Sequence, residues 1–231
     1  MEDFPYGMCG TGFLVRSKFE FFFVTAKHIL RSGDHERLRV ARSFASSDII
    51  ELGQYGYVKI PEAEEDTDWA DIAIFSVVPD VFGSSGDNEA VEPAYVPESD
   101  TRHLLQKRVI LTVRGFPAAA PLSRIEFAQK RIIVQPLTSD AYFVRPTESV
   151  GCYELQFVES CPIRDFNFMS GSPVFAKMLH NRDLIWILVG VLLRAGGPER
   201  LGRFVSIEIA KRAFGFYADP GGPTSGHPSC G

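Results

Sequence analysis

The stretch FEFFFVT at residues 19–25 decides the fold class of this chain. Every residue in it except Glu20 is aromatic or β-branched, which is the composition enriched in β-strands. A shorter apolar run at residues 13–15 precedes it, across a polar turn at residues 16–18. Two such runs joined by a turn predict a β-hairpin whose second strand is largely buried.

Similar runs recur along the chain between turn-forming residues, so the sequence predicts an all-β protein. We expect residues 125–135 and 141–145 to pair as a long hairpin around the turn at residues 136–140. The nearly helical spacing of Ile207, Ala210, Phe214 and Phe216 predicts a short C-terminal helix. The other predicted strands cover residues 38–41, 49–60, 72–75, 108–114, 153–158, 184–193 and 203–207.

The chain is predicted to divide into two β halves. Residues 78–105 are rich in proline, glycine, serine and acidic residues, which is typical of an irregular crossing segment. We therefore expect an N-terminal domain at residues 1–105 that ends in this segment, and a C-terminal domain at residues 106–218. Residues 219–231, rich in glycine, proline and serine, are expected to form a flexible tail.

Composition and charge exclude several classes of function. The net charge is −5 and no run of lysine and arginine offsets it, so we expect neither nucleic-acid nor membrane binding. The N-terminus has no secretory signal pattern, and the longest apolar run, residues 185–193, is about half of what crosses a bilayer. None of the cysteines has metal-site or Cys-x-x-Cys spacing, so we expect a cytoplasmic protein without metal or cofactor. These cysteines are Cys9, Cys152, Cys161 and Cys230.

The stretch FMSGSPV at residues 168–174 holds the candidate nucleophile, Ser170. Gly171 lets the backbone pass close behind the hydroxyl because it has no Cβ, and Pro173 restricts the turn that leaves the site. Serine, glycine and proline also form ordinary surface turns, so this motif alone does not distinguish a nucleophile from a loop.

A histidine and an aspartate provide the independent support. His28 follows the buried run at residues 19–25, within a segment suited to a single helical turn. Asp71 opens an apolar strand, so its carboxylate should be partly buried and in need of a partner. Taken singly, His28 also fits a histidine satisfied at a strand end, and Asp71 a residue that starts a strand.

Together the three residues fit nucleophilic catalysis. A serine hydroxyl attacks a carbonyl when neutral imidazole takes its proton, and a buried carboxylate orients that imidazole. The chain order His28, Asp71, Ser170 is the order found in chymotrypsin-type proteases. An α/β-hydrolase esterase fits poorly, because no Gly-x-Ser-x-Gly motif surrounds Ser170.

The sequence resembles the trypsin-like (chymotrypsin-fold) serine peptidases, especially the cysteine-poor bacterial type. The likeness extends from about residue 8 to 216 and is carried by GTGF at 10–13, VTAKH at 24–28, DIAI at 71–74 and SGSPV at 170–174, with weaker support from LVGV at 188–191. It implies two six-stranded antiparallel β-barrels, the first bearing His28 and Asp71 and the second Ser170. It also implies a serine endopeptidase in which His28 is general base and then acid, Asp71 orients it, and Ser170 is acylated.

The resemblance further implies that the backbone N–H groups of Phe168 and Ser170 form the oxyanion hole. The family usually has glycine at the position of Phe168, and a phenylalanine resists the backbone conformation that glycine adopts easily. We therefore expect an oxyanion hole that is poorly formed until substrate or a partner rearranges it. A catalytically inactive module of the same fold, which binds a peptide or protein, is the alternative function.

The substrate is expected to be a protein or peptide, and a protein partner is expected to activate the enzyme. Two arginines of the predicted pocket would favour an acidic side chain before the cut, and both also fit solvated loop arginines. The residues predicted to bind substrate are Arg164, Val191, Leu192, Leu193 and Arg194.

Overall fold

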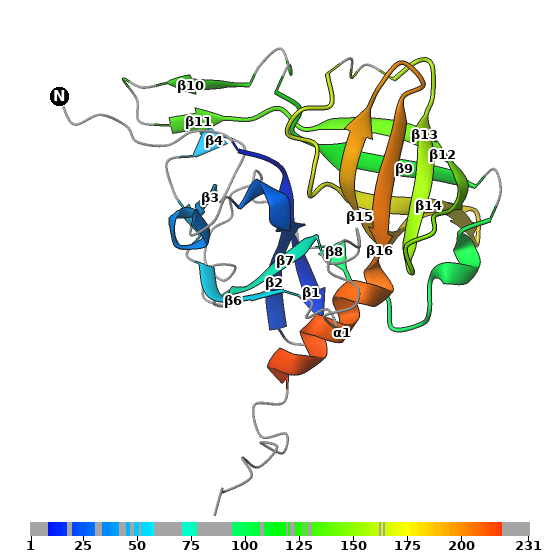
Figure 1. Ribbon diagram of the computed structural model, residues 1–231, viewed down its shortest axis with the longest axis horizontal. Coiled ribbons are helices and arrows are strands. Elements are labelled where there is room, and N and C mark those ends of the chain that lie inside the picture. The colour runs from blue at the N-terminus through cyan, green and yellow to red at the C-terminus, as the bar shows by residue number, and fades with distance from the viewer. Residues whose placement is uncertain are drawn as a thin grey trace, which may run out of the picture.

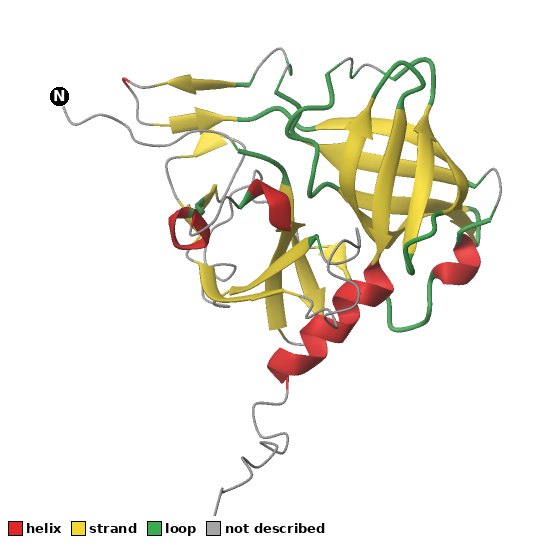
Figure 2. Ribbon diagram, in the orientation of Figure 1, coloured by secondary structure: helices red, strands yellow, loops and turns green. Residues whose placement is uncertain are grey.

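The protein is mostly β-sheet with one α-helix among the residues that the structure describes (Figure 2). This computed structural model describes residues 9–17, 20–30, 34–41, 45–46, 49–50, 52–57, 71–77, 94–106, 109–118, 120, 123–126, 128, 131–161, 163 and 165–218.

The first half is built on the hairpin that FEFFFVT predicts. β1 (Gly12–Ser17) pairs antiparallel with β2 (Glu20–Ala26), and β2 is buried from Phe22 onward. β7 (Ile72–Val77) pairs with the other edge of β2, and the described strands form a five-stranded sheet in the order β6-β7-β2-β1-β8. The other elements of this half are η1 (Lys27–Ile29), η2 (Asp34–Arg37), β3 (Val40–Ala41), β4 (Ala45–Ser46), β5 (Ile49–Ile50), β6 (Leu52–Tyr57), β8 (Ala94–Tyr95) and η6 (Arg102–Leu104).

The second half contains a closed six-stranded barrel in the order β12-β13-β16-β15-β14-β9 (Figure 1). The predicted C-terminal helix is confirmed as α1 (Ile207–Ala218), which follows the last barrel strand directly. A small sheet of β10, β11 and β4 lies beside the barrel. The strands are β9 (Ile110–Gly115), β10 (Arg124–Glu126), β11 (Arg131–Ile133), β12 (Leu137–Pro146), β13 (Cys152–Phe157), β14 (Pro173–His180), β15 (Asp183–Gly196) and β16 (Leu201–Ser206).

One expectation about the sheets is confirmed only in part, and another is wrong. Among the described residues one closed barrel is seen, because β8 offers just two residues to β1 and the far edge of β6 has no partner among the described strands. The predicted long hairpin is wrong, since β12 pairs with β9 and β13 while β10 pairs with β11. The alternate burial of Ser139, Ala141 and Phe143 gives β12 an inward face that fits the barrel wall.

The two halves share a hydrophobic core. One buried cluster joins Phe22 and Ile74 of the first sheet to Val191 of the barrel and Phe214 of α1. The rings of Phe22 and Phe214 stack with their centroids 4.8 Å apart, where α1 runs beside the first half (Figure 1). This common core packs β1, β2 and β7 against β15 and α1. Among the described residues, no helix combines the length and apolar character needed to cross a bilayer.

Candidate active site

His28 lies in the short helical turn η1, directly after β2 ends at Ala26. The Lys27 N–H donates to the Asp71 carbonyl oxygen at 3.0 Å, and the Leu30 N–H donates to the Lys27 carbonyl oxygen at 2.9 Å. The turn is therefore anchored to Asp71 at its start and closed by its own hydrogen bond at its end, and the predicted placement of His28 in a single helical turn is confirmed.

Asp71 immediately precedes β7 and faces His28 across the β2–β7 pair. Its Oδ2 lies 2.6 Å from His28 Nδ1, and its Oδ1 accepts the His28 backbone N–H at 2.8 Å. The two side chains are 28% and 48% exposed for Asp71 and His28, respectively. Of the two tautomers of a neutral imidazole, a carboxylate at this distance favours the one with the proton on Nδ1. In that tautomer Nε2 can accept a proton. The partner expected for Asp71 is therefore His28.

Ser170 lies in a loop that hydrogen bonds attach to β15. The Gly171 N–H donates to the Leu192 carbonyl oxygen at 2.7 Å, and the Leu192 N–H donates to the Ser172 carbonyl oxygen at 2.8 Å. The Ser172 hydroxyl is buried and donates to the Met169 carbonyl oxygen at 2.6 Å. The backbone after Ser170 is thereby fixed to the barrel, and Ser172 ties the residue before Ser170 to this fixed segment.

Gly171 brings the same loop against the strands that precede His28. Gly171 has φ 89°, and a Cβ there would lie 2.0 Å from the Thr11 carbonyl oxygen and 2.5 Å from Thr25 Oγ1. Only a glycine fits such an approach. Within the described part of the chain, the Ser170 hydroxyl makes no hydrogen bond, to His28 or to any other residue.

Phe168 adopts the backbone conformation that the sequence led us to doubt. Its φ is 71°, and the Met169 N–H donates to the Phe166 carbonyl oxygen at 3.0 Å. Residues 166–169 thus form a type II turn with Phe168 at the position that usually requires glycine. The expectation that a phenylalanine avoids this conformation is wrong here.

The peptide before Phe168 has a defined orientation. The Asn167 carbonyl oxygen accepts the Ala118 N–H at 3.0 Å, so the Phe168 N–H points away from Ala118 across the planar peptide. In the described part of the chain neither the Phe168 nor the Ser170 N–H has an acceptor. The intervening Met169 N–H does have one, so two unsatisfied donors flank a satisfied one.

The residues predicted to bind substrate fall into three groups. The side chains of Val191, Leu192 and Leu193 are buried in the core, and the Leu192 N–H and carbonyl oxygen already bond to Ser172 and Gly171. Arg194 is exposed at the outer part of β15. Arg164 lies outside the described residues.

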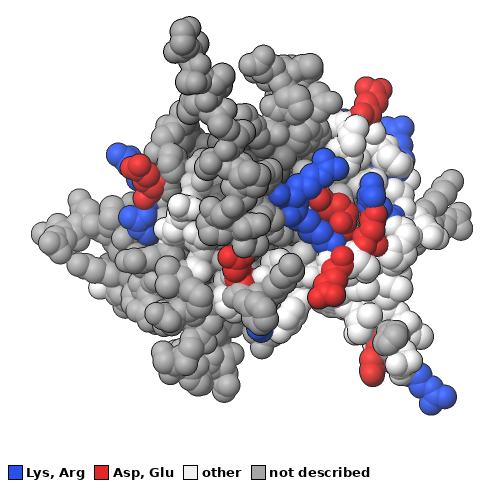
Figure 3. Space-filling view, turned by 90° about the horizontal axis from the view of Figure 1, so that it is seen from below, with Lys and Arg blue, Asp and Glu red and all other residues white. Residues whose placement is uncertain are grey.

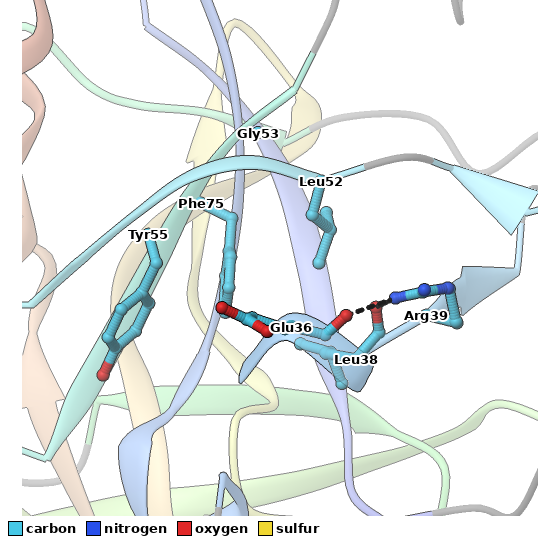
Figure 4. Close-up of a pocket in the computed structure, with 7 residues that line it drawn as sticks. All are labelled: Glu36, Leu38, Arg39, Leu52, Gly53, Tyr55 and Phe75. Atoms are coloured by element: carbon cyan, nitrogen blue, oxygen red, sulfur yellow. Dashed lines mark hydrogen bonds between the residues drawn. The ribbon is translucent and has the colours of Figure 1, made fainter. Parts of the chain in front are cut away.

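The structure has a separate hollow in the first half that was not predicted from the sequence (Figure 4). Its volume is about 450 Å³, and Arg39 closes its rim by donating to the carbonyl oxygens of Glu36 and Leu38 at 2.7 and 2.9 Å. No predicted catalytic residue lines it. The lining residues are Glu36, Leu38, Arg39, Leu52, Gly53, Tyr55 and Phe75.

Charged side chains on the face shown in Figure 3 are mixed in sign over its described part. Arg145 pairs with the largely buried Glu154 at 2.7 Å, and Lys211 pairs with the half-buried Glu208 at 2.9 Å. In another pair, hydrogen bonds from Arg102 lower the pKa of Asp100 from its ordinary value of 3.8 to about 2. No large patch of one sign is visible in the described part of this face.

Thr11 is the residue at this site whose contacts the sequence did not predict. It is 1% exposed and hydrogen-bonds to residues of both halves. The GTGF block carried part of the family resemblance, yet nothing in that pattern indicates distant partners.

No protein-family model matches the chain, and no curated protein matches it. A functional assignment therefore rests on the arrangement of the residues described above.

Proposed function

We propose that this chain is a trypsin-like serine endopeptidase with His28, Asp71 and Ser170 as its catalytic triad. The observation that carries the proposal is the pair of hydrogen bonds from His28 to the Asp71 carboxylate, 2.6 Å from Nδ1 and 2.8 Å from the backbone nitrogen. A carboxylate that holds both the ring and the backbone of one histidine gives the imidazole a single orientation and tautomer.

The reaction begins when Ser170 Oγ attacks the peptide carbonyl and His28 Nε2 takes the hydroxyl proton. Asp71 stays ionised and stabilises the imidazolium. The imidazolium then gives the proton to the leaving amine, and the peptide bond breaks to leave an acyl ester on Ser170. Water attacks this ester with His28 again acting as base, which releases the acid and restores the serine.

The carbonyl oxygen becomes negatively charged during both attacks and needs hydrogen-bond donors. The Phe168 and Ser170 N–H groups have no acceptor within the described part of the chain, which supports their assignment to the oxyanion hole. One such donor contributes on the order of 100- to 1000-fold in rate in other serine proteases.

Further parts of the proposal concern the surroundings of the site. We propose that the first half is a second six-stranded antiparallel barrel. Cys161 is buried and not in a disulfide, which supports a reducing, cytoplasmic location. The substrates are proteins or peptides, and a protein partner activates the enzyme.

The second candidate function is a catalytically inactive binding module of the same fold. The Ser170 hydroxyl makes no hydrogen bond to His28 among the described residues, and this observation favours the alternative. In such a module the protein holds a peptide without cutting it.

A peptide mixture separates the two functions. The protein and a Ser170→Ala variant are incubated with peptides from a denatured proteome, and new termini are identified by mass spectrometry. New termini that appear with the wild type and disappear with Ser170→Ala support the peptidase. Peptides that the wild type retains on a column but never cuts support the binding module.

A further inference from the structure

We propose that Thr11 is a positioning residue that keeps the Phe168 N–H and the Ser170 backbone in their working orientation beside His28. This inference rests on the proposed peptidase function. One buried hydroxyl in the first half would hold the turn at residues 166–169 in the conformation that presents the Phe168 N–H.

The hydroxyl of Thr11 bridges two segments of the second half. Thr11 Oγ1 donates to the Phe168 carbonyl oxygen at 2.6 Å and accepts the Phe116 N–H at 3.0 Å. Thr11 is 1% exposed, so water does not compete for these bonds. The hydroxyl therefore acts as a donor and an acceptor at the same time, and so it links the Phe168 and Phe116 segments.

The backbone of Thr11 adds two more hydrogen bonds. The Thr11 N–H donates to the Ser170 carbonyl oxygen at 3.1 Å, and the Thr11 carbonyl oxygen accepts the Thr25 hydroxyl at 2.6 Å. Thr25 belongs to β2, the strand that leads into His28. Thr11 thereby connects the strand before the base with the loop of the nucleophile.

These contacts explain how Phe168 keeps a positive φ. A non-glycine residue in the left-handed region carries strain of roughly 1–2 kcal/mol, so a type I turn with negative φ is the relaxed alternative. In the present turn Ala118 holds the carbonyl before Phe168, and Thr11 holds the carbonyl after it. With both flanking peptides held, the Phe168 N–H cannot rotate away without breaking a hydrogen bond.

Three variants isolate the hydroxyl. Thr11→Val keeps the shape but removes the hydrogen bonds of this hydroxyl with the Phe168 carbonyl and the Phe116 N–H, and Thr11→Ser restores the hydroxyl. Thr112→Val is the matched control, because Thr112 is also a fully buried threonine whose hydroxyl bonds within the barrel, to Asp140 Oδ1 at 2.9 Å.

The first readout is the rate at which a fluorophosphonate probe labels each protein. We expect Thr11→Val to lower the rate about 100-fold, and Thr11→Ser and Thr112→Val to stay within about threefold of wild type. Thermal unfolding of each variant separates loss of fold from loss of positioning. An intact Thr11→Val variant that labels within about threefold of wild type overturns the inference.

The second readout is the crystal structure of Thr11→Val, which does not depend on catalysis. We expect Phe168 to relax to negative φ, and an unchanged type II turn overturns the inference. If wild type itself is never labelled, the proposed peptidase function fails, and the turn in this crystal structure still decides whether Thr11 holds it.

Discussion

The Asp71 carboxylate receives two hydrogen bonds from one residue, His28, with Oδ2 2.6 Å from Nδ1 and Oδ1 2.8 Å from the backbone nitrogen. One bond sets the tautomer of the ring, and the other sets the position of the turn that carries it. The Asp71 carboxylate therefore fixes both the tautomer of the His28 ring and the position of the His28 backbone.

The Asp71→Asn variant tests this relationship. An amide has one accepting oxygen, so it can serve only one of the two His28 N–H groups and turns a donor toward the other. We expect probe labelling to fall about 10³- to 10⁴-fold, because the disfavoured tautomer turns an N–H toward the serine. Asp140→Asn, which removes a carboxylate bonded to Lys177 instead, is the control and should label normally. Normal labelling of Asp71→Asn would contradict the triad.

Gly171→Ala tests the close approach of the serine loop to Thr11. The added Cβ would lie 2.0 Å from the Thr11 carbonyl oxygen at φ 89°, so the loop must move away. We expect a loss of about 2–4 kcal/mol in the free energy of unfolding, together with slower labelling. Gly197→Ala is matched, with φ 76° and nothing within 4 Å of its Cβ, and should cost only about 1 kcal/mol. Equal losses in the two variants would mean that contact with Thr11 is unimportant.

Phe168→Gly tests whether the phenylalanine strains the turn. Glycine adopts φ 71° freely, so relief of strain should exceed its entropic cost and stabilise the protein by up to about 1 kcal/mol. The N–H is retained, so labelling should be maintained or rise. Arg182→Gly, with φ 74° in the β14–β15 turn, should stabilise similarly without any effect on labelling. A large drop in labelling of Phe168→Gly would show that the ring itself is needed.

The ion pair between Asp100 and Arg102 should make the free energy of unfolding depend on pH. Hydrogen bonds from the Arg102 side chain and backbone lower its folded-state pKa from 3.8 to about 2. The folded state therefore binds this proton less readily than the unfolded state, so the stabilisation is complete above pH 3.8 and is lost as the pH falls through about 2.

Urea unfolding of wild type and Asp100→Asn from pH 6 down to about pH 2 measures this contribution. The wild type should be slightly more stable at pH 6, and the difference should shrink as the pH falls below 3.8. The effect is small because the carboxylate is exposed to solvent. A difference that widens toward low pH would contradict this sign.

Features of the site that depend on local sequence were predicted from it. The run at residues 19–25 encodes a buried strand, and the single turn after it places His28 at that strand's end. An aspartate before an apolar strand indicates a partly buried carboxylate in need of a partner. The strand pairing that brings Asp71 to His28 then follows from the burial of β2 between two neighbours.

Features that depend on distant partners were not predictable. The positive φ of Phe168 is held by Thr11 and Ala118, and neither is close to it in the sequence. Likewise, the burial pattern of β12 fits a hairpin as well as a barrel wall until β9 and β13 are known to flank it. Periodicity identifies which face of a strand is buried, but it does not name the strand or loop that covers it.

The most direct test of the peptidase assignment is the attachment site of a fluorophosphonate on the wild-type protein, mapped by mass spectrometry of its proteolytic fragments. We expect one phosphonylated residue, Ser170, whose modification is lost in His28→Ala. The peptidase assignment is contradicted if Ser170 stays unmodified with and without candidate activating partners, or if the probe attaches with equal efficiency in His28→Ala.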